Sequence, residues 1–230
     1  MDVARKVQLH ELTTKLGIDL QKLDILNTAL IHPTYAYEHP RHAEHNQRLE
    51  FLGDAVLNVS MAEYLYLSYP GKSEGELTKI RAEVVSEQGL AIVAQRLAVG
   101  KYLLLGKGEE ASGGRERISI LADAVEAIFA AVYLELGFAY VKKMIIEILL
   151  DQIIDTINNG SRDYKTKLQE ILQKNQGETA TYRILEATGP EHDKTFLAGV
   201  YQKDRLLGEG EGKSKKDAEQ NAAKTALELL

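Results

Sequence analysis

The sequence predicts an all-α domain followed by a small α+β domain with the element order α-β-β-β-α. Through the first 158 residues, apolar side chains recur at intervals of three and four, which is the period of a helix that buries one face. Farther along, the pattern changes to short strand-like segments bounded by Gly, Pro and Asp. A run of small and polar residues, NNGSRD at 158–163, separates the two patterns. We therefore expect a helical domain over 1–158, a linker over 159–162 and a second domain over 163–230.

Helices in the first domain are expected near 23–32, 47–68, 75–98, 118–136 and 138–157. Pro33 should end the first of these helices, and Pro70 with Gly71 should end the second, because proline cannot continue a helix. The stretch GKGEEASGGRER at 106–117 is polar and rich in glycine, so we expect a mobile loop there.

The second domain is expected to contain a helix at 164–174, strands at 181–188, 194–202 and 205–212, and a closing helix at 214–230. Glycines weaken the third strand, and the residues GPEHD between the first two strands are typical of a turn. Ser214, followed three residues later by Asp217, resembles a helix cap. An antiparallel sheet with both helices on one face would bury the apolar side of every element.

The composition limits the compartment and the partners. The 230 residues include no cysteine, which excludes disulfides and thiolate metal sites and fits a reducing compartment. No apolar run approaches the roughly 20 residues of a membrane helix, and the N-terminus lacks the apolar stretch of a signal peptide. The net charge of −6 arises before residue 162, because residues 162–230 hold 12 basic and 12 acidic side chains. We expect a cytoplasmic protein with no membrane partner and no nucleotide cofactor.

Two of the predicted helices each carry a pair of carboxylates among apolar residues. Glu50 and Asp54 in QRLEFLGDAVL are four residues apart, and Asp123 and Glu126 in SILADAVEAIFAAVYLE are three apart, so each pair shares one helix face. Taken singly, either pair could be exposed or paired with a base such as Arg48. Buried carboxylates without partners are unfavourable, however, and four that converge would require a cation. Oxygen ligands suit Mg²⁺ or Mn²⁺, so the pattern favours a metal-dependent phosphohydrolase.

Longer stretches of the sequence resemble one known family. QRLEFLGDAVL, SEGELTKIRAEVVS at 73–86 and GGRERISILADAVEAIFAAVYLE at 113–135 are similar, in order, to the characteristic segments of bacterial ribonuclease III. LQE at 168–170, GPEHDKTF at 189–196 and GKSKKDAEQNAA at 212–223 resemble the double-stranded-RNA-binding domain that follows in that family. The resemblance extends from about Leu26 to Leu230.

The resemblance implies a homodimeric endonuclease that cuts double-stranded RNA. Its four catalytic carboxylates fall on Glu50, Asp54, Asp123 and Glu126, which would bind Mg²⁺, with Mn²⁺ as a possible substitute, and Glu126 would be the critical ligand. Cleavage would leave 5′-phosphate and 3′-hydroxyl ends with a short 3′ overhang, in the processing of ribosomal and other RNA. Phe51 would pack into the partner subunit, although a core position in its own subunit is the ordinary alternative.

Some positions depart from the family pattern or have only accessory roles in it. Gln47 stands where family members usually have Glu, which puts an accessory role at this position in doubt. Pro33 follows His32 where an Arg is more typical, so one phosphate contact would be absent. Glu74 matches an accessory acidic position near the RNA, although an exposed glutamate without function is the alternative.

A lysine group marks the start of the closing helix of the second domain. Lys213, Lys215 and Lys216 oppose the helix dipole, so a purely structural role is unattractive, although a solvated charged turn is the alternative. A phosphate would be attracted both by the lysines and by the helix N-terminus. By resemblance, these lysines would bridge the major-groove phosphates of an RNA duplex. Gln169 and His192 would then reach 2′-hydroxyls in the flanking minor grooves.

Two other functions compete with the nuclease. An RNA-binding scaffold with an inert helical dimer would lack one or more of the four acids, and this sequence lacks none. A hydrolase of small phosphate esters would have no use for a duplex-binding lysine group.

Overall fold

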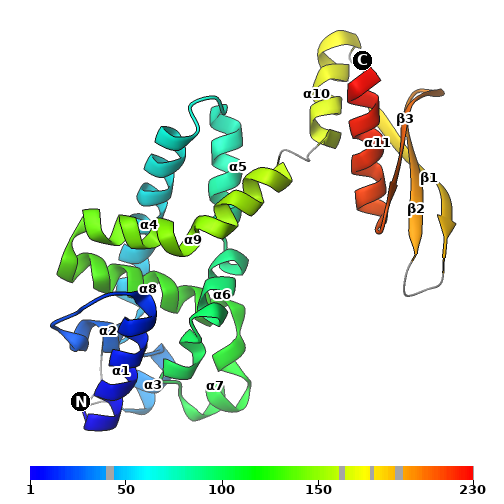
Figure 1. Cartoon of the computed structure of the whole chain (residues 1–230). Coiled ribbons are helices and arrows are strands. Elements are labelled where there is room, and N and C mark those ends of the chain that lie inside the picture. Colours follow the sequence, from blue (N-terminus) through cyan, green and yellow to red (C-terminus); the bar gives the residue numbers. More distant parts are fainter. Residues whose placement is uncertain (40–43, 161–163, 177–178, 190–193, 230) are drawn as a thin grey trace. The chain divides into compact units, whose positions relative to one another are not determined.

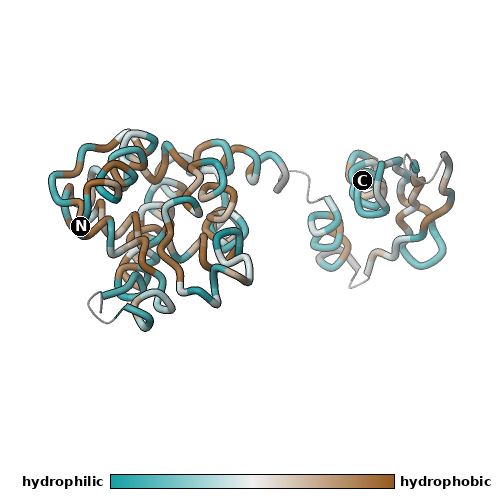
Figure 2. The backbone as a smooth tube through the Cα atoms, turned by 90° about the horizontal axis from the view of Figure 1, so that it is seen from below, coloured by the Kyte–Doolittle hydropathy of each residue, from teal (hydrophilic) through white to brown (hydrophobic). Residues whose placement is uncertain are grey.

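The computed structural model describes the chain except for residues 40–43, 161–163, 177–178, 190–193 and 230 (Figure 1). The chain divides into two compact units, residues 1–156 and 157–230, and each is described here by itself. The order of elements is helical in the first unit and α-β-β-β-α in the second, so the predicted fold class is confirmed. Hydrophobic and hydrophilic segments are interspersed along the backbone of both units (Figure 2).

The helices of the first unit are α1 (Val3–Leu16), α2 (Leu23–Ala29), α3 (Pro33–Glu38), α4 (Gln47–Ser68), α5 (Glu74–Val84), α6 (Glu87–Arg96), α7 (Lys107–Ala111), α8 (Ile118–Leu136) and α9 (Phe138–Gly160), which crosses the boundary to the second unit. Short 3₁₀ helices lie at Val99–Tyr102 and Gly114–Glu116. Within the described part of the chain, no helix combines the length and the apolar character needed to cross a membrane.

The central element of the first unit is α8, against which α4, α6 and α2 pack. Its sequence is apolar on almost every side, and a helix of that kind is stable only when it is surrounded by other elements. Its buried side chains run from Ile120 to Val132 and include Phe129, which is almost completely enclosed. The two polar residues of interest on α8, Asp123 and Glu126, are only half-buried and lie where α4 crosses.

Several predicted elements differ in detail from the observed ones. The segment expected as one helix over 75–98 forms α5 and α6, because Ser86 accepts a hydrogen bond from the Gly89 amide and starts a new helix. Pro33 follows α2 and is the first residue of α3. The missing amide hydrogen of proline has no consequence there, because the first amides of a helix have no partner within it. No helix was predicted at α1, whose buried face mixes leucines with the guanidinium of Arg5.

The stretch 106–117, expected as a mobile loop, contains α7 and a 3₁₀ turn. Two ion pairs hold it together, Glu110 with Arg115 and Glu109 with Arg117, both at 2.6 Å. The Arg115 guanidinium also donates to two backbone carbonyls, those of Gly100 and Leu103, at 2.8 Å each. The glycines and charged residues of 106–117 therefore belong to a defined structure that leads into α8.

The second unit contains α10 (Tyr164–Gln176), β1 (Ala180–Thr188), β2 (Thr195–Gln202), β3 (Arg205–Gly212) and α11 (Lys215–Leu229). The strands form one antiparallel sheet in the order β1-β2-β3, and both helices contribute to a single core. Asp217 donates its amide to the Ser214 hydroxyl at 3.1 Å, which confirms the predicted cap. Asn159 and Gly160, expected as linker, are the last residues of α9.

Glycines in β3 allow α11 to lie directly on the sheet. A Cβ atom at Gly208, Gly210 or Gly212 would lie 2.1–2.6 Å from backbone nitrogens of α11. The facing residues of α11 are alanines, including Ala222 and Ala226, which are fully buried. The glycines that were predicted to weaken this strand are therefore required for its packing.

Candidate active site

The candidate site forms where α4 crosses α8 at Gly53. A Cβ atom at position 53 would lie 1.8 Å from the backbone oxygen of Glu126, so only glycine allows the two helices to approach this closely. Glu50 and Asp54 lie on either side of Gly53 along α4. The crossing therefore brings this carboxylate pair towards Asp123 and Glu126 of α8.

Three of the four predicted carboxylates converge. Glu50, Asp123 and Glu126 each offer one carboxylate oxygen, and these three oxygens all lie within 4.8 Å of one another. Asp54 is exposed and does not belong to this set; its Oδ1 accepts a hydrogen bond from Nδ2 of Asn58 at 2.7 Å. Three converging oxygen ligands are the donors that Mg²⁺ and Mn²⁺ prefer, so the residues present fit a divalent ion.

The protein leaves the negative charge of this cluster uncompensated. Within the described residues, none of the four carboxylates forms an ion pair with Lys or Arg, so the alternative of ordinary salt-bridged surface acids does not hold. Burial and then Asp54 raise the pKa of Glu126 to about 8. Burial and then Glu50 raise the pKa of Asp123 to about 6, and burial and Asp54 raise the pKa of Glu50. Groups held together against their own repulsion in this way are typical of a functional site.

Comparison with known proteins gives the family. A ribonuclease-III-like family model matches residues 22–153, and the double-stranded RNA binding motif matches residues 164–230. Ribonuclease 3 of Syntrophomonas wolfei is 55% identical over 205 residues, which cover 89% of this chain and 88% of that protein. Ribonuclease 3 of Natranaerobius thermophilus is 48% identical and covers 96% and 95%. The chain belongs to the ribonuclease III family.

A solved structure agrees with this assignment. The nuclease domain of ribonuclease III from Campylobacter jejuni superposes with a TM-score of 0.58 at 37% identity, covering 61% of this chain and 95% of that one. With its nuclease and RNA-binding domains together, this ribonuclease III is an endoribonuclease specific for double-stranded RNA. The carboxylate cluster lies in the nuclease domain, within the matched residues.

Phe51 and Gln47, for which the sequence predicts roles outside the carboxylate cluster, both lie on the surface of α4. Phe51 is 80% exposed, so it is not a core residue of its own subunit. Gln47 is exposed at the first position of α4. At 1.5 Å per residue, Ser68 at the far end of α4 lies roughly 27 Å from Glu50.

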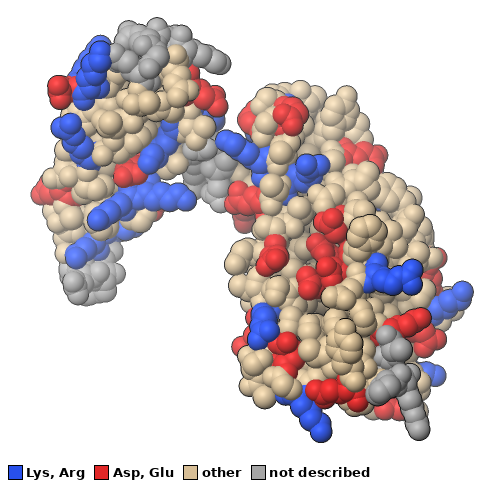
Figure 3. All heavy atoms as spheres, turned by 180° about the vertical axis from the view of Figure 1, so that it is seen from behind, with Lys and Arg blue, Asp and Glu red and all other residues tan. Residues whose placement is uncertain are grey.

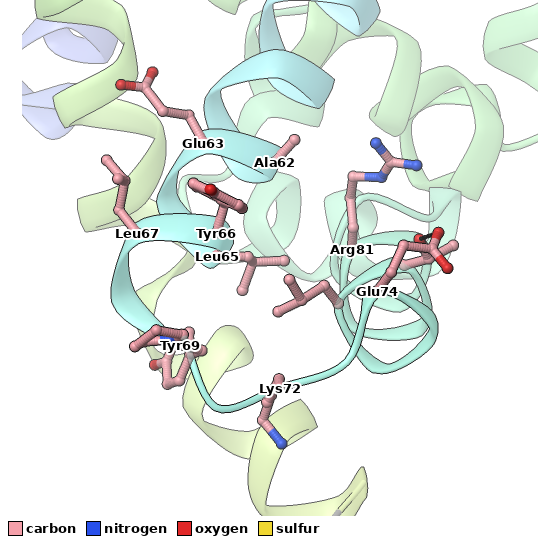
Figure 4. A pocket seen from close by; sticks show the side chains of 12 residues that line it. Ala62, Glu63, Leu65, Tyr66, Leu67, Tyr69, Lys72, Glu74 and Arg81 are labelled. Carbon is pink, nitrogen blue, oxygen red and sulfur yellow. Dashed lines mark hydrogen bonds between the residues drawn. The ribbon is translucent and has the colours of Figure 1, made fainter.

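Glu74 lies near that far end of α4 and not beside the carboxylates. It starts α5, accepts a hydrogen bond from the Thr78 hydroxyl at 3.0 Å, and lines a groove of about 820 Å³ with Tyr66, Tyr69 and Arg81 (Figure 4). Glu74 therefore lies away from the carboxylate cluster.

In the RNA-binding domain, the three predicted lysines are exposed: Lys215 and Lys216 begin α11, and Lys213 lies just before it. Figure 3 shows Lys and Arg side chains (blue) on the surface of this domain as seen from behind. Gln169 is partly buried, and its Oε1 accepts a hydrogen bond from the Ala180 amide at 2.9 Å, while its Nε2 is buried without a partner among the described residues. His192 lies outside the described residues.

One charged residue of the site was missed from the sequence. Glu87, the first residue of α6, is close enough to the cluster for its charge to raise the pKa of both Asp123 and Glu126. A single helix over 75–98 would have hidden this position in the middle of a helix. The signal was Ser86 followed by Glu87, a cap residue and an acidic first turn, which together mark a helix start.

The raised pKa values predict that metal-free protein loses stability as the pH rises from about 5 to about 8. In this range the unfolded chain has released the proton of Glu126, whose ordinary pKa is 4.5, whereas the folded protein retains it up to a pKa of about 8. The folded state then binds more protons, so the free energy of unfolding falls with increasing pH. Allowing for solvent screening, we expect a loss of about 1–2 kcal/mol. Calorimetry in EDTA measures it; a Tm that stays constant or rises over this range would contradict the prediction.

Proposed function

We propose that this ribonuclease III is a Mg²⁺-dependent homodimer that cuts both strands of an RNA duplex. The products would carry 5′-phosphate and 3′-hydroxyl ends with a short 3′ overhang, and ribosomal precursors would be among the substrates. The observation that supports the metal dependence is the convergence of Glu50, Asp123 and Glu126 with no basic partner in the described part of the chain. A cytoplasmic location fits a sequence without cysteine.

The three converging carboxylates would hold the ion, with Asp54 beside them. Bound there, Mg²⁺ would polarise a phosphodiester and make a water molecule acidic enough to act as the nucleophile. The side chains have two tasks before that step. Glu126 must give up the proton that it retains up to a pKa of about 8, and Glu50 and Asp123 must stay close together despite their repulsion. The close crossing of α4 and α8 at Gly53 holds Glu50 and Asp123 near each other.

Cleavage of a labelled RNA duplex in different divalent ions tests the proposal. We expect cutting in Mg²⁺ or Mn²⁺, and retention of the uncut duplex in Ca²⁺ or EDTA. The products should be substrates for an RNA ligase that requires a 5′-phosphate. Uncut duplex in every metal would favour the scaffold, and hydrolysis of a small phosphate ester with an intact duplex would favour the small-substrate hydrolase.

The exposed apolar face of α4 supports the homodimer. Phe51, Ala55, Ala62 and Tyr66 lie along one side of the helix, and the last two continue into the groove that Tyr69 lines (Figure 4). Phe51 and Tyr66, the two large side chains of this row, are 80% and 72% exposed, and monomeric proteins rarely expose large contiguous apolar patches. A two-fold symmetric dimer would bring this face against its own copy. In the Campylobacter protein, a region of the nuclease domain is involved in dimer formation.

Phe51→Asp is therefore expected to weaken dimerisation by about 100-fold or more, because it places a charge where an aromatic anchor would be buried. Sedimentation equilibrium of the full chain measures the dissociation constant. Val7→Asp is the matched control, since Val7 is also an exposed apolar residue of the first unit but lies on α1. A Phe51→Asp protein that remains as dimeric as the control would exclude this face as the interface.

Replacing Lys215 and Lys216 by Ala is expected to weaken duplex binding and to flatten its salt dependence. Each lost phosphate contact should lower the slope of log K against log salt by about one. Fluorescence anisotropy with a labelled duplex in Ca²⁺ measures the slope. Lys224→Ala is the control, because Lys224 lies on the same helix but pairs with Glu228. A slope that is unchanged relative to the control would remove these lysines from the RNA contact.

A further inference from the structure

Among the residues that the structure describes, Asp54 is the only one of the four carboxylates with a side-chain hydrogen-bond partner. Nδ2 of Asn58 lies 2.7 Å from Oδ1 of Asp54 and 3.0 Å from the backbone oxygen of the same residue. A side-chain amide carries two N–H hydrogens, so it can donate one to each oxygen. The two contacts fix the rotamer of Asn58 and hold one oxygen of the Asp54 carboxylate in place. Within the described residues, Oδ2 of Asp54 has no hydrogen-bond partner.

The charges near Asp54 indicate what the hydrogen bond from Asn58 does. The charge of Asp54 repels both Glu50 and Glu126. Without a fixed donor, repulsion would favour rotamers that carry the Asp54 carboxylate away from the cluster. The Asn58 amide is neutral, so it can orient Asp54 without cancelling the negative charge that attracts a cation. A lysine or arginine at position 58 would orient Asp54 too, but it would also repel a divalent ion.

We propose that Asn58 is a positioning residue of the active site, which orients Asp54 so that its second oxygen faces the hydration shell of the divalent ion. The inference rests on the proposed metal dependence. Mg²⁺ gives up its water ligands reluctantly and keeps several of them in protein sites. A carboxylate beside the three converging oxygens can therefore act on the ion through water. Hydrogen-bond partners of such carboxylates typically change metal affinity by about 10–100-fold when they are removed.

Helix stability does not account for asparagine at this position. In the interior of a helix, Asn is less favourable than Ala, because its side chain competes with the backbone for hydrogen bonds. Asn58 lies in the middle of a helix of 22 residues. If Asn58 had only a structural role, Asn58→Ala would raise the stability of the helix and leave Mn²⁺ affinity unchanged. If Asn58 positions Asp54, the same substitution lowers Mn²⁺ affinity.

Binding of Mn²⁺ to the RNA-free, full-length protein tests the proposal. In isothermal titration, we expect Asn58→Ala to bind Mn²⁺ about tenfold more weakly, without loss of thermal stability, and Asn58→Gln to recover part of the affinity. The Mg²⁺ concentration for half-maximal cleavage should rise by a similar factor, while the rate at saturating Mg²⁺ stays within about threefold. Val59→Ala, on the next residue of α4, is the control and should bind as the wild type does.

A double-mutant cycle separates action through Asp54 from any other role. In an Asp54→Asn background, Asn58→Ala should change Mn²⁺ affinity by less than twofold. An equal loss in both backgrounds, or wild-type affinity in the single variant, would overturn the proposal. Sedimentation of each variant shows whether the subunits stay associated, and a loss of affinity that follows dissociation also counts against it. If the wild type itself binds no Mn²⁺, it is the proposed metal dependence that fails.

Discussion

Glu126→Gln is expected to slow duplex cleavage by at least about 1,000-fold, which corresponds to about 4 kcal/mol of activation free energy. Glutamine keeps the volume and one oxygen of the side chain, so the packing of α8 is retained. It replaces the carboxylate that supplies one of the three oxygens within 4.8 Å of one another by a neutral amide, which is a weaker ligand for a divalent ion. The RNA-binding domain is a separate unit, so affinity for the duplex in Ca²⁺ should stay within about twofold. Single-turnover cleavage and anisotropy measure the two quantities.

The same substitution should stabilise the metal-free protein at high pH. It removes the group whose pKa is raised to about 8 by burial and by neighbouring acids. The Tm of Glu126→Gln in EDTA at pH 8.5 should therefore exceed that of the wild type, and most of the pH dependence between 5 and 8 should disappear. Glu83→Gln, an exposed acid of α5, serves as the control for both measurements. Equal cleavage by Glu126→Gln and wild type would contradict the assignment of the site.

Gly53→Ala is expected to destabilise the nuclease domain by about 3 kcal/mol or more. The added methyl group would lie 1.8 Å from the oxygen and 2.4 Å from the carbonyl carbon of Glu126, and both are backbone atoms that no rotamer change can move. Helices α4 and α8 must then separate, which costs more than the 1–3 kcal/mol typical of an overpacked core. We expect the Tm of the nuclease transition to fall by about 6–12 °C.

Gly75→Ala provides the matched control for this substitution. Gly75 also lies in a helix, but a Cβ atom there would meet nothing within 4 Å. Alanine should therefore stabilise α5 by up to about 1 kcal/mol. Because separation of α4 from α8 also moves the carboxylates apart, Gly53→Ala should weaken Mn²⁺ binding where Gly75→Ala does not. A Gly53→Ala protein with unchanged Tm would show that the close crossing is not required.

The sequence predicted the elements whose pattern is strong and local. Helices α4 and α8 have the predicted bounds, because long apolar periodicity leaves few alternatives. The two carboxylate pairs could be placed on helix faces for the same reason. What the sequence could not show was the distance between the pairs, which depends on a backbone contact at Gly53. Gly53 is part of QRLEFLGDAVL, but its contact with the backbone of Glu126 on α8 is known only from the structure.

Other features depend on contacts that no local pattern reveals. The break at Ser86 competes with a helical period that continues across it, so Glu87 was overlooked. The buried face of α1 includes Arg5, whose guanidinium donates to Asn27 and to the backbone oxygen of Tyr102, and such a face lacks a clear apolar stripe. Asn58 does not stand out in the sequence, because its hydrogen bond to Asp54 is known only from the side-chain geometry.

The location of Mn²⁺ in crystals of the RNA-free protein tests the central claim most directly. An anomalous difference map collected after soaking should show the ion between the carboxylates of Glu50, Asp123 and Glu126, with metal–oxygen distances of about 2.0–2.3 Å. The same map from Glu126→Gln crystals should lack the peak. An ion bound elsewhere in the nuclease domain, with these three carboxylates free of metal, would contradict the account.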